Sequence, residues 1–364
     1  MKCMEPVKIY WDKEEEKYSY TKPKHIDWDK CIVTSCGRCP ACRAEWRTHL
    51  ARRVIYELEN YNYNERCFIT LTCDDDHIDK VFPGMSLNHE YFQKFIKKIR
   101  SHLKYYKIPH KPLKYLVSGE YGQHNTHRPH FHLILFGWKP DDMEPKRFKT
   151  EKGYQVYKSK LLEEKWGAGF VEVGDVTEQT APYMVKYIVK YSEVKKSVTG
   201  VRKFTDDIIN EETGEIKEHT YTKKIRVPIF KAPVYVGKDE NGNYLYEKRL
   251  VKPPYIVYPK KIMGIDYFLK HYKQILGNGF IMDSRGKRHS IPKNFLKYCK
   301  EHEENIELNE CYLQYLERLQ ILFEEEKQYL ISLGYITFNQ RYEYYKEQGK
   351  IKRIEFESLK NKHR

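Results

Sequence analysis

Residues 130–136, His-Phe-His-Leu-Ile-Leu-Phe, alternate two histidines with apolar side chains and then continue as an unbroken apolar stretch. Such a run is typical of a central strand that is buried on both faces. Residues i and i+2 of a strand point to the same face, so His130 and His132 can bind a single cation. The pattern also fits an ordinary half-buried strand, but the motifs that follow it favour a metal site.

A third ligand is expected from the preceding predicted strand, at residues 115–122. A hairpin can bring Glu120 opposite the histidines, provided that the register places its carboxylate on their face. His127 and Asp74 are the alternative ligands. Imidazoles favour Mn²⁺ or Zn²⁺, whereas a carboxylate and phosphate oxygens suit Mg²⁺ or Mn²⁺.

Tyrosines recur at every fourth position further along the chain, at Tyr183, Tyr187 and Tyr191. On a helix these positions lie on one face. Their rings either pack into a core or offer a phenol oxygen as a nucleophile. A phenol needs activation because its ordinary pKa is about 10. Lys186 and Lys190 lie on the same predicted helix, where an ammonium group can lower that pKa or neutralise charge on a phosphate.

The cysteines suggest a second metal site. The chain has nine cysteines, and an odd number fits a reducing compartment better than a disulfide framework. A cluster with the spacing Cys-x₄-Cys-x₂-Cys-x₂-Cys consists of Cys31, Cys36, Cys39 and Cys42. This spacing leaves three interpretations open: a structural zinc site, reduced structural thiols, and an iron–sulfur centre.

The charge of the chain indicates a polyanionic partner. The 66 Lys and Arg residues outnumber the 51 Asp and Glu residues, which gives a net charge of +15. Such a surface attracts nucleic acid, and the 32 tyrosines suit base stacking on single strands, although basic charge can also serve solubility alone. No apolar run reaches about 18 residues and the start has no apolar signal core, so we expect a cytoplasmic protein without a membrane span.

The order of the periodic segments predicts an α+β fold. Between residues 67 and 191 the patterns read strand, helix, strand, strand, helix, strand and helix, which suggests a central antiparallel sheet with flanking helices. The C-terminal part is of mixed character. We expect four consecutive segments: a polar leader (1–30), a main domain with the cysteine cluster (31–191), a strand-rich extension (192–303), and a helical region with a charged tail (304–364).

Several motifs together resemble the HUH endonucleases, and among them the replication initiators of small circular single-stranded DNA phages, the gokushovirus-like microviruses. The matching blocks share order and spacing over residues 31–191. They are Cys-Gly-Arg-Cys-Pro-Ala-Cys-Arg at 36–43, Phe-Ile-Thr-Leu-Thr-Cys-Asp-Asp at 68–75, Gly-Glu-Tyr-Gly at 119–122, Arg-Pro-His-Phe-His at 128–132 and Tyr-Met-Val-Lys-Tyr at 183–187. The two-histidine and two-tyrosine blocks are the specific ones.

The resemblance implies a ferredoxin-like or RRM-like HUH core and a Mg²⁺ or Mn²⁺ cofactor. His130 and His132 would hold the metal, and Tyr183 and Tyr187 would be the paired nucleophiles. In this chain the tyrosine spacing repeats once more at Tyr191. We expect the first pair to be productive, because the family pattern begins at the start of the helix.

The implied function is rolling-circle replication. The protein would nick single-stranded DNA at an origin through a 5′-phosphotyrosine intermediate and rejoin the ends to release circles. We expect Arg128, Lys190 and Tyr191 to contact the DNA, and a host polymerase and helicase to be partners in the bacterial cytoplasm. Two alternatives stay open: a single-tyrosine transposase or relaxase, and a non-catalytic basic nucleic-acid-binding module with a structural metal.

Overall fold

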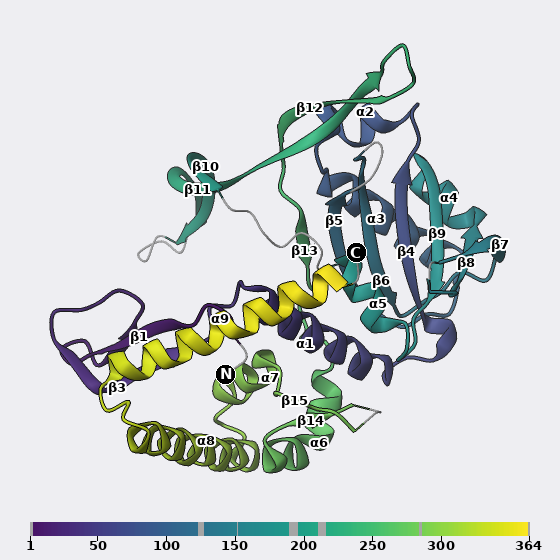
Figure 1. The fold of residues 1–364 in the computed structure, drawn as a ribbon. Coiled ribbons are helices and arrows are strands. Elements are labelled where there is room, and N and C mark those ends of the chain that lie inside the picture. The colour runs from purple at the N-terminus through teal and green to yellow at the C-terminus, as the bar shows by residue number, and fades with distance from the viewer. Residues whose placement is uncertain are drawn as a thin grey trace. The chain divides into compact units, whose positions relative to one another are not determined.

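A computed structural model describes residues 3–122, 127–150, 152–188, 196–209, 216–283 and 286–362. The chain divides into two compact units, Leu58–Lys261 and, together, Met1–Glu57 with Ile262–Arg364 (Figure 1). The second unit therefore joins both ends of the chain. The expected boundaries after residues 30, 191 and 303 follow the chain order instead, and they stay a prediction.

A large antiparallel sheet organises unit Leu58–Lys261. Seven strands of its described residues form this sheet in the order β13-β5-β6-β4-β9-β8-β7 (Figure 1). The strands are β4 (Arg66–Cys73), β5 (Lys114–Tyr121), β6 (Pro129–Phe136), β7 (Met143–Lys149), β8 (Gln155–Ser159), β9 (Gly169–Asp175) and β13 (Tyr255–Val257). The helices of this unit are η1 (Tyr63–Glu65), α2 (Ile78–Val81), η2 (Pro83–Met85), α3 (His89–Tyr105), α4 (Lys160–Trp166) and α5 (Ala181–Ile188). The predicted α+β class is confirmed.

The predicted order of elements also matches the structure, since β4, α3, β5, β6, α4, β9 and α5 follow one another along the chain, with β7 and β8 inserted before α4. In space the first four of these strands are arranged as β5-β6-β4-β9. This is the β-α-β-β-α-β arrangement of ferredoxin-like folds. It places β6, which carries the two histidines, between β5 and β4.

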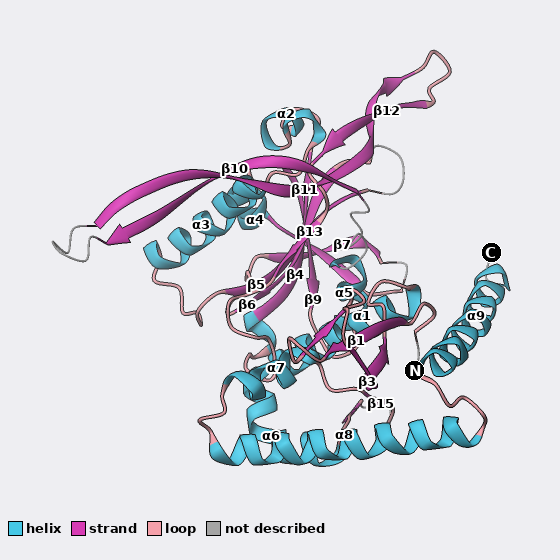
Figure 2. Cartoon of the chain, turned by 90° about the vertical axis from the view of Figure 1, so that its left-hand side faces the viewer, coloured by secondary structure: helices cyan, strands magenta, loops and turns pink. Residues whose placement is uncertain are grey.

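The two faces of the sheet have different roles. Alternate residues of the central strands are fully buried together with the apolar faces of α3 and α4; on β6 these are Phe131, Leu133 and Leu135. Each such side chain contributes about 1.5–3 kcal/mol of burial free energy. The histidines occupy the intervening positions and therefore face the other side of the sheet. Figure 2 views the sheet near its edge, with α3 and α4 on one side and α5 on the other.

The strand-prone segment that follows α5 forms a ribbon of β10 (Lys196–Ile209), β11 (Ile216–Lys238) and β12 (Tyr244–Val251). The predicted hairpin at residues 237–243 is present, because β11 and β12 pair across it. Within the turn the Asp239 carboxylate accepts hydrogen bonds from the backbone amides of Asn241 and Asn243, at 2.9 and 2.8 Å. Asx turns of this kind explain why Asp and Asn favour such positions.

The other unit combines a small sheet with helices. Its strands are β1 (Val7–Asp12), β2 (Lys17–Ser19), β3 (Ile26–Thr34), β14 (Ile281–Met282) and β15 (Arg288–His289). Its helices are α1 (Pro40–Leu58, of which Leu58 falls in the first unit), α6 (Ile265–Asn278), α7 (Lys293–Glu301), α8 (Ile306–Ser332) and α9 (Phe338–Lys362). The segment expected to be a polar leader thus contains β1, β2 and part of β3. Among the described residues, we find no helix with both the length and the apolar character needed to cross a membrane.

We predict that Gly169→Ala destabilises the sheet. Gly169 begins β9 with φ +127°, and a Cβ atom there would lie 2.5 Å from the backbone nitrogen of Asp74. Strain and overlap together should cost about 2 kcal/mol or more in the free energy of unfolding.

Gly153 provides a matched control, because it also has a positive φ (+80°), but a Cβ atom added there would meet no other atom within 4 Å. Thermal denaturation should show a clearly lower Tm for Gly169→Ala than for Gly153→Ala. Equal melting temperatures would contradict the steric argument.

Candidate functional site

Strand register brings three predicted metal ligands together on the sheet face that lies opposite the α3/α4 core. In the pairing of β5 with β6, Glu120 is directly opposite His130. Since His132 lies two residues further along β6, its ring points to the same face. The Nε2 atoms of His130 and His132 lie 3.0 and 3.2 Å from the same carboxylate oxygen, Oε1 of Glu120. The predicted triad is therefore a structural cluster.

The other ring nitrogens of both histidines are held by neighbours. Nδ1 of His130 donates to the carbonyl oxygen of Arg128 at 3.0 Å, and Nδ1 of His132 lies 2.9 Å from the hydroxyl of Thr70 on β4. Phe68, also on β4, stacks on the His132 ring. Such outer contacts fix the tautomer and the orientation of metal-binding histidines. In the neutral His130 ring, a proton on Nδ1 leaves the Nε2 lone pair available for a cation.

The chemistry of Glu120 fits a bound cation. The side chain is buried, with 2% of its surface exposed, and its second oxygen, Oε2, has no hydrogen-bond partner among the described residues. Burial alone would raise the pKa of Glu120, but the hydrogen bonds to His130 and His132 outweigh it and lower the pKa to about 2. A buried carboxylate with an unsatisfied oxygen is costly unless a positive charge compensates it. Two imidazole nitrogens and a carboxylate form a donor set that divalent cations accept.

The alternative third ligands lie elsewhere. The Asp74 carboxylate accepts hydrogen bonds from the backbone amide and the ring of His77, at 3.0 and 2.7 Å. Nδ1 of His127 lies 2.7 Å from the carbonyl oxygen of Gly122. Neither residue belongs to the cluster of Glu120 with the two histidines.

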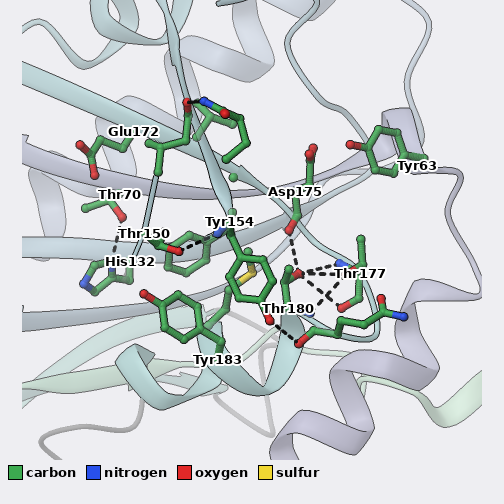
Figure 3. Close-up of a pocket in the computed structure, with 17 residues that line it drawn as sticks. Tyr63, Thr70, His132, Thr150, Tyr154, Glu172, Asp175, Thr177, Thr180 and Tyr183 are labelled. Carbon is green, nitrogen blue, oxygen red and sulfur yellow. Dashed lines mark hydrogen bonds between the residues drawn. The ribbon is translucent and has the colours of Figure 1, made fainter. Parts of the chain in front are cut away.

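A cavity of about 460 Å³ extends from His132 to the start of α5. Tyr183, in the first turn of α5, lines this cavity, and its hydroxyl is directed towards the side on which His132 lies (Figure 3). The helix start is fixed by a reciprocal cap: the amide of Thr177 donates to Oγ1 of Thr180 (2.8 Å), and the amide of Thr180 donates to Oγ1 of Thr177 (3.2 Å). Pro182 is tolerated because it falls in the first turn. Local sequence therefore anchors the tyrosine next to the candidate metal site.

Aromatic rings and paired charges line the rest of the cavity. The Tyr154 ring lies 5.5 Å from the Tyr183 ring, between centroids. Two carboxylates of the lining are neutralised, since Glu172 pairs with Lys146 (3.1 Å) and Asp175 pairs with Lys139 (2.7 Å). Burial and the Asp175 carboxylate raise the pKa of the lining residue Tyr63, which keeps this phenol protonated. Tyr63 is therefore unsuited to act as a nucleophile.

The remaining residues of the tyrosine motif are only partly covered. Lys186 and Tyr187 lie in α5, but their side chains are outside the described part of the structure, as are all atoms of Lys190 and Tyr191. Their predicted roles stay predictions. Arg128, the remaining predicted DNA contact, is described: its guanidinium group pairs with Asp75 and also donates to the carbonyl oxygen of Cys73.

The predicted cysteine cluster needs one correction. Cys36, Cys39 and Cys42 lie together, but their fourth member is Cys3 and not Cys31. Cys31 lies on β3, where its thiol donates to the carbonyl oxygen of Asp27 at 3.2 Å. The regular spacing of the sequence favoured Cys31, whereas the fold brings in a cysteine that is distant along the chain.

Two residues near the histidine and tyrosine motifs were not anticipated. Thr70 holds Nδ1 of His132, and the ammonium group of Lys152 lies 5.6 Å from the centre of the Tyr183 ring. The alternation in Phe68-Ile-Thr-Leu-Thr72 could have indicated that Thr70 shares a face with the histidines. Nothing in the sequence around Lys152 links it to Tyr183, since the contact depends on how the chain returns to the cavity.

We predict that Glu120→Gln weakens Mn²⁺ binding at least about 10-fold, because even the loss of an outer-shell partner commonly costs that much. The amide keeps the size of the side chain but removes its charge. Isothermal titration calorimetry of the full chain with Mn²⁺ measures the effect. Asp74→Asn is the matched control and should leave the affinity unchanged. If Asp74→Asn weakened binding as much as Glu120→Gln, the third ligand would be misassigned.

Comparisons with known proteins agree with the predicted resemblance. A family model for replication-associated proteins of the ORF2 type matches residues 66–192. The replication-associated protein VP4 of Bdellovibrio phage phiMH2K is 33% identical over 192 residues, which cover 52% of this chain and 58% of that protein. The replication-associated protein ORF2 of Spiroplasma virus 4 is 31% identical over 207 residues, which cover 54% of this chain and 62% of that protein.

A third relative, the replication-associated protein ORF4 of Chlamydia phage 1, is 31% identical over 162 residues, which cover 43% of this chain and 37% of that protein. The matches thus span less than two thirds of the length of each relative. No solved structure matches the chain significantly. The matched segment of the family model contains the whole Glu120–His130–His132 cluster and Tyr183. Through residues 66–192 the chain belongs with the replication-associated proteins of small phages.

Proposed function

We propose that the protein initiates rolling-circle replication as a metal-dependent tyrosine endonuclease and strand transferase of the HUH type. The observation that carries the proposal is the convergence of Glu120, His130 and His132 beside the cavity that contains Tyr183. A cation site and a phenol at the edge of one cavity are the two groups that cleavage of a phosphodiester by tyrosine requires. The match to phage replication-associated proteins supports single-stranded origin DNA as the substrate.

The cleavage step follows from these groups. Glu120, His130 and His132 would hold Mg²⁺ or Mn²⁺, which would polarise the scissile phosphodiester when bound. The phenol of Tyr183 loses its proton, its oxygen forms a bond to phosphorus, and the bond from phosphorus to the DNA 3′ oxygen breaks. The 3′ oxygen takes up a proton and leaves as a hydroxyl, while the 5′-phosphate stays on the tyrosine. A host polymerase can then extend the free 3′-hydroxyl, and a host helicase would separate the strands.

A second tyrosine would allow the product to be closed into a circle. After one round of synthesis, Tyr187 would cleave the regenerated junction in the same way. The new 3′-hydroxyl would attack the ester on Tyr183, which releases the first tyrosine and forms the joined strand. Each exchange replaces one phosphate ester by another, so that no nucleoside triphosphate is needed.

Positive charge near the nucleophiles supports this assignment. A cation stabilises a phenolate and the additional charge of the transition state. Lys152 lies against the Tyr183 ring, and Lys186 follows it by three residues. We assign both lysines to this role, together with a phosphate contact for Arg128 and DNA contacts for Lys190 and Tyr191.

The cavity would receive a nucleotide next to the scissile phosphate. Its volume lies within the range of small-molecule sites. Phe68 and Tyr154 line it with aromatic rings, on which bases of any sequence can stack. Because Lys146 and Lys139 neutralise its carboxylates, the cavity does not repel a polyanion strongly.

We predict that Tyr183→Phe and Tyr187→Phe each still form a covalent adduct with a cleaved single-stranded oligonucleotide, whereas the double variant forms none. Adjacent tyrosines at i and i+4 lie about 6 Å apart along the helix, so that one metal site can serve both. The adduct is detected by gel shift under denaturing conditions, and peptide mass spectrometry identifies the modified tyrosine.

Tyr191→Phe is the control for this series and should keep both cleavage and joining. An adduct on Tyr191, or one that survives in the double variant, would show that the productive pair is a different one. Loss of all adducts in Tyr183→Phe alone would instead favour the single-tyrosine chemistry of a transposase or relaxase.

We further predict that His132→Ala lowers the rate of nicking at least about 100-fold, since it removes a direct metal ligand. Its affinity for single-stranded DNA should stay within about threefold of the wild-type affinity, because phosphate contacts dominate binding. Fluorescence anisotropy measures binding, and a labelled oligonucleotide measures nicking. Wild-type protein that binds DNA but never nicks it with Mg²⁺ or Mn²⁺ would favour a non-catalytic binding module. The proposed site of action is the cytoplasm of a bacterial host.

A further inference from the structure

The cluster of Cys3, Cys36, Cys39 and Cys42 lies in the other unit of the chain and has no part in the proposed reaction. All four Sγ atoms lie within 4.8 Å of one another. Each of the four cysteines is free, with no disulfide. Cys3, Cys39 and Cys42 are buried, and Cys36 is partly exposed.

The spacing of the sulfur atoms fits a single tetrahedral ion. Four thiolates at a Zn–S distance of about 2.3 Å lie about 3.8 Å from one another. The observed distance between the Sγ atoms of Cys3 and Cys39 is 3.8 Å. A disulfide requires about 2.05 Å. An iron–sulfur cluster places several iron and sulfide atoms between its cysteines, which would hold their sulfur atoms further apart than in this cluster.

Backbone amides point at the sulfur atoms. The donors are the amides of Glu5 and Cys36 to Cys3 (both 3.3 Å), of Met4 to Cys39 (3.4 Å), and of Arg38 and Cys39 to Cys36 (3.5 and 3.3 Å). A neutral thiol is a weak acceptor, whereas a thiolate attracts several N–H groups. These amides therefore match the outer shell of metal-bound thiolates, which are hydrogen-bonded to their surroundings.

The local fold presents the cysteines as a compact knuckle. Gly37 adopts φ +72° between Cys36 and Cys39, a conformation that favours glycine. Pro40 then begins α1, so Cys42 falls in its first turn. The positive end of a helix dipole stabilises negative charge there. Only Cys3 comes from a distant part of the chain.

The cluster also holds the N-terminal segment in place. The buried apolar group around it consists of Met4 and the cysteines, with Ala41 beside them, and is small. Gly349 of α9 packs against the same segment, since a Cβ atom there would lie 2.7 Å from the carbonyl oxygen of Met4. Arg353 of α9 pairs with Glu5. So small a core contributes little burial energy, and a metal ion would supply the missing stabilisation.

We propose that Cys3, Cys36, Cys39 and Cys42 bind one structural Zn²⁺ ion, which ties residues 3–5 to the start of α1 and thereby orders the contact of this segment with α9. The site is closed, with four protein ligands, as in structural zinc sites. It is independent of the proposed endonuclease activity, and its test needs no nicking assay.

The test is the metal content of the full chain. Elemental analysis of freshly purified, reduced wild-type protein should give about one zinc per chain. Cys3→Ser should lose most of this zinc, whereas Cys31→Ser, the matched control from the same segment, should keep it. After exchange with Co²⁺, the wild-type protein and Cys31→Ser should show the intense visible absorption of tetrahedral cobalt thiolate, and Cys3→Ser should not.

Several results would overturn the proposal. Wild-type protein without zinc would show that the thiols are merely structural, and a coloured protein with iron would show an iron centre. Zinc lost from Cys31→Ser but kept by Cys3→Ser would return the fourth ligand to Cys31. If Cys3→Ser does not fold, the wild-type protein still decides: modification of its thiols by a mercurial reagent should release the zinc, and failure to release it would contradict cysteine ligation.

Discussion

Strand β6 has to serve the core and the site at the same time, because alternate side chains of a strand point to opposite faces. Phe131 and Leu133 are fully buried under the helices, and this burial fixes the strand against rotation or slippage. The histidines then have no choice of face. A slip by one residue would bury both imidazoles in the apolar core and expose the large apolar side chains, which is costly in both directions.

The neighbouring strands depend on the same register. β5 contributes Glu120 opposite His130, and β4 contributes Thr70 opposite His132. The cluster therefore draws on three adjacent strands, each fixed by its own buried residues. In the absence of a cation, Oε2 of Glu120 is buried without a partner among the described residues. The core thus supports a site that is unfavourable by itself, as is common for functional groups held by a rigid scaffold.

The sequence predicted what depends on local periodicity and on pairing of consecutive strands. The α+β class, the order of elements and the hairpin that joins Glu120 to the histidines all follow from such patterns. The fourth cysteine of the cluster could not be predicted in this way, because Cys3 reaches it only through tertiary structure. The same is true of Lys152 at Tyr183. The strands β1 and β2 were missed because short, polar and half-exposed strands carry little periodic signal.

Protons and a cation compete for the same atoms of the candidate metal site. Oε1 of Glu120 faces both Nε2 atoms at hydrogen-bond distance, so that without a cation at least one of these nitrogens must carry a proton to avoid facing a lone pair. Binding of a cation must displace this proton, because a protonated imidazole nitrogen has no lone pair to donate. Since the pKa of Glu120 is lowered to about 2, the carboxylate stays ionised across the physiological range. The imidazoles therefore set the pH dependence, and cation affinity must fall as the pH falls.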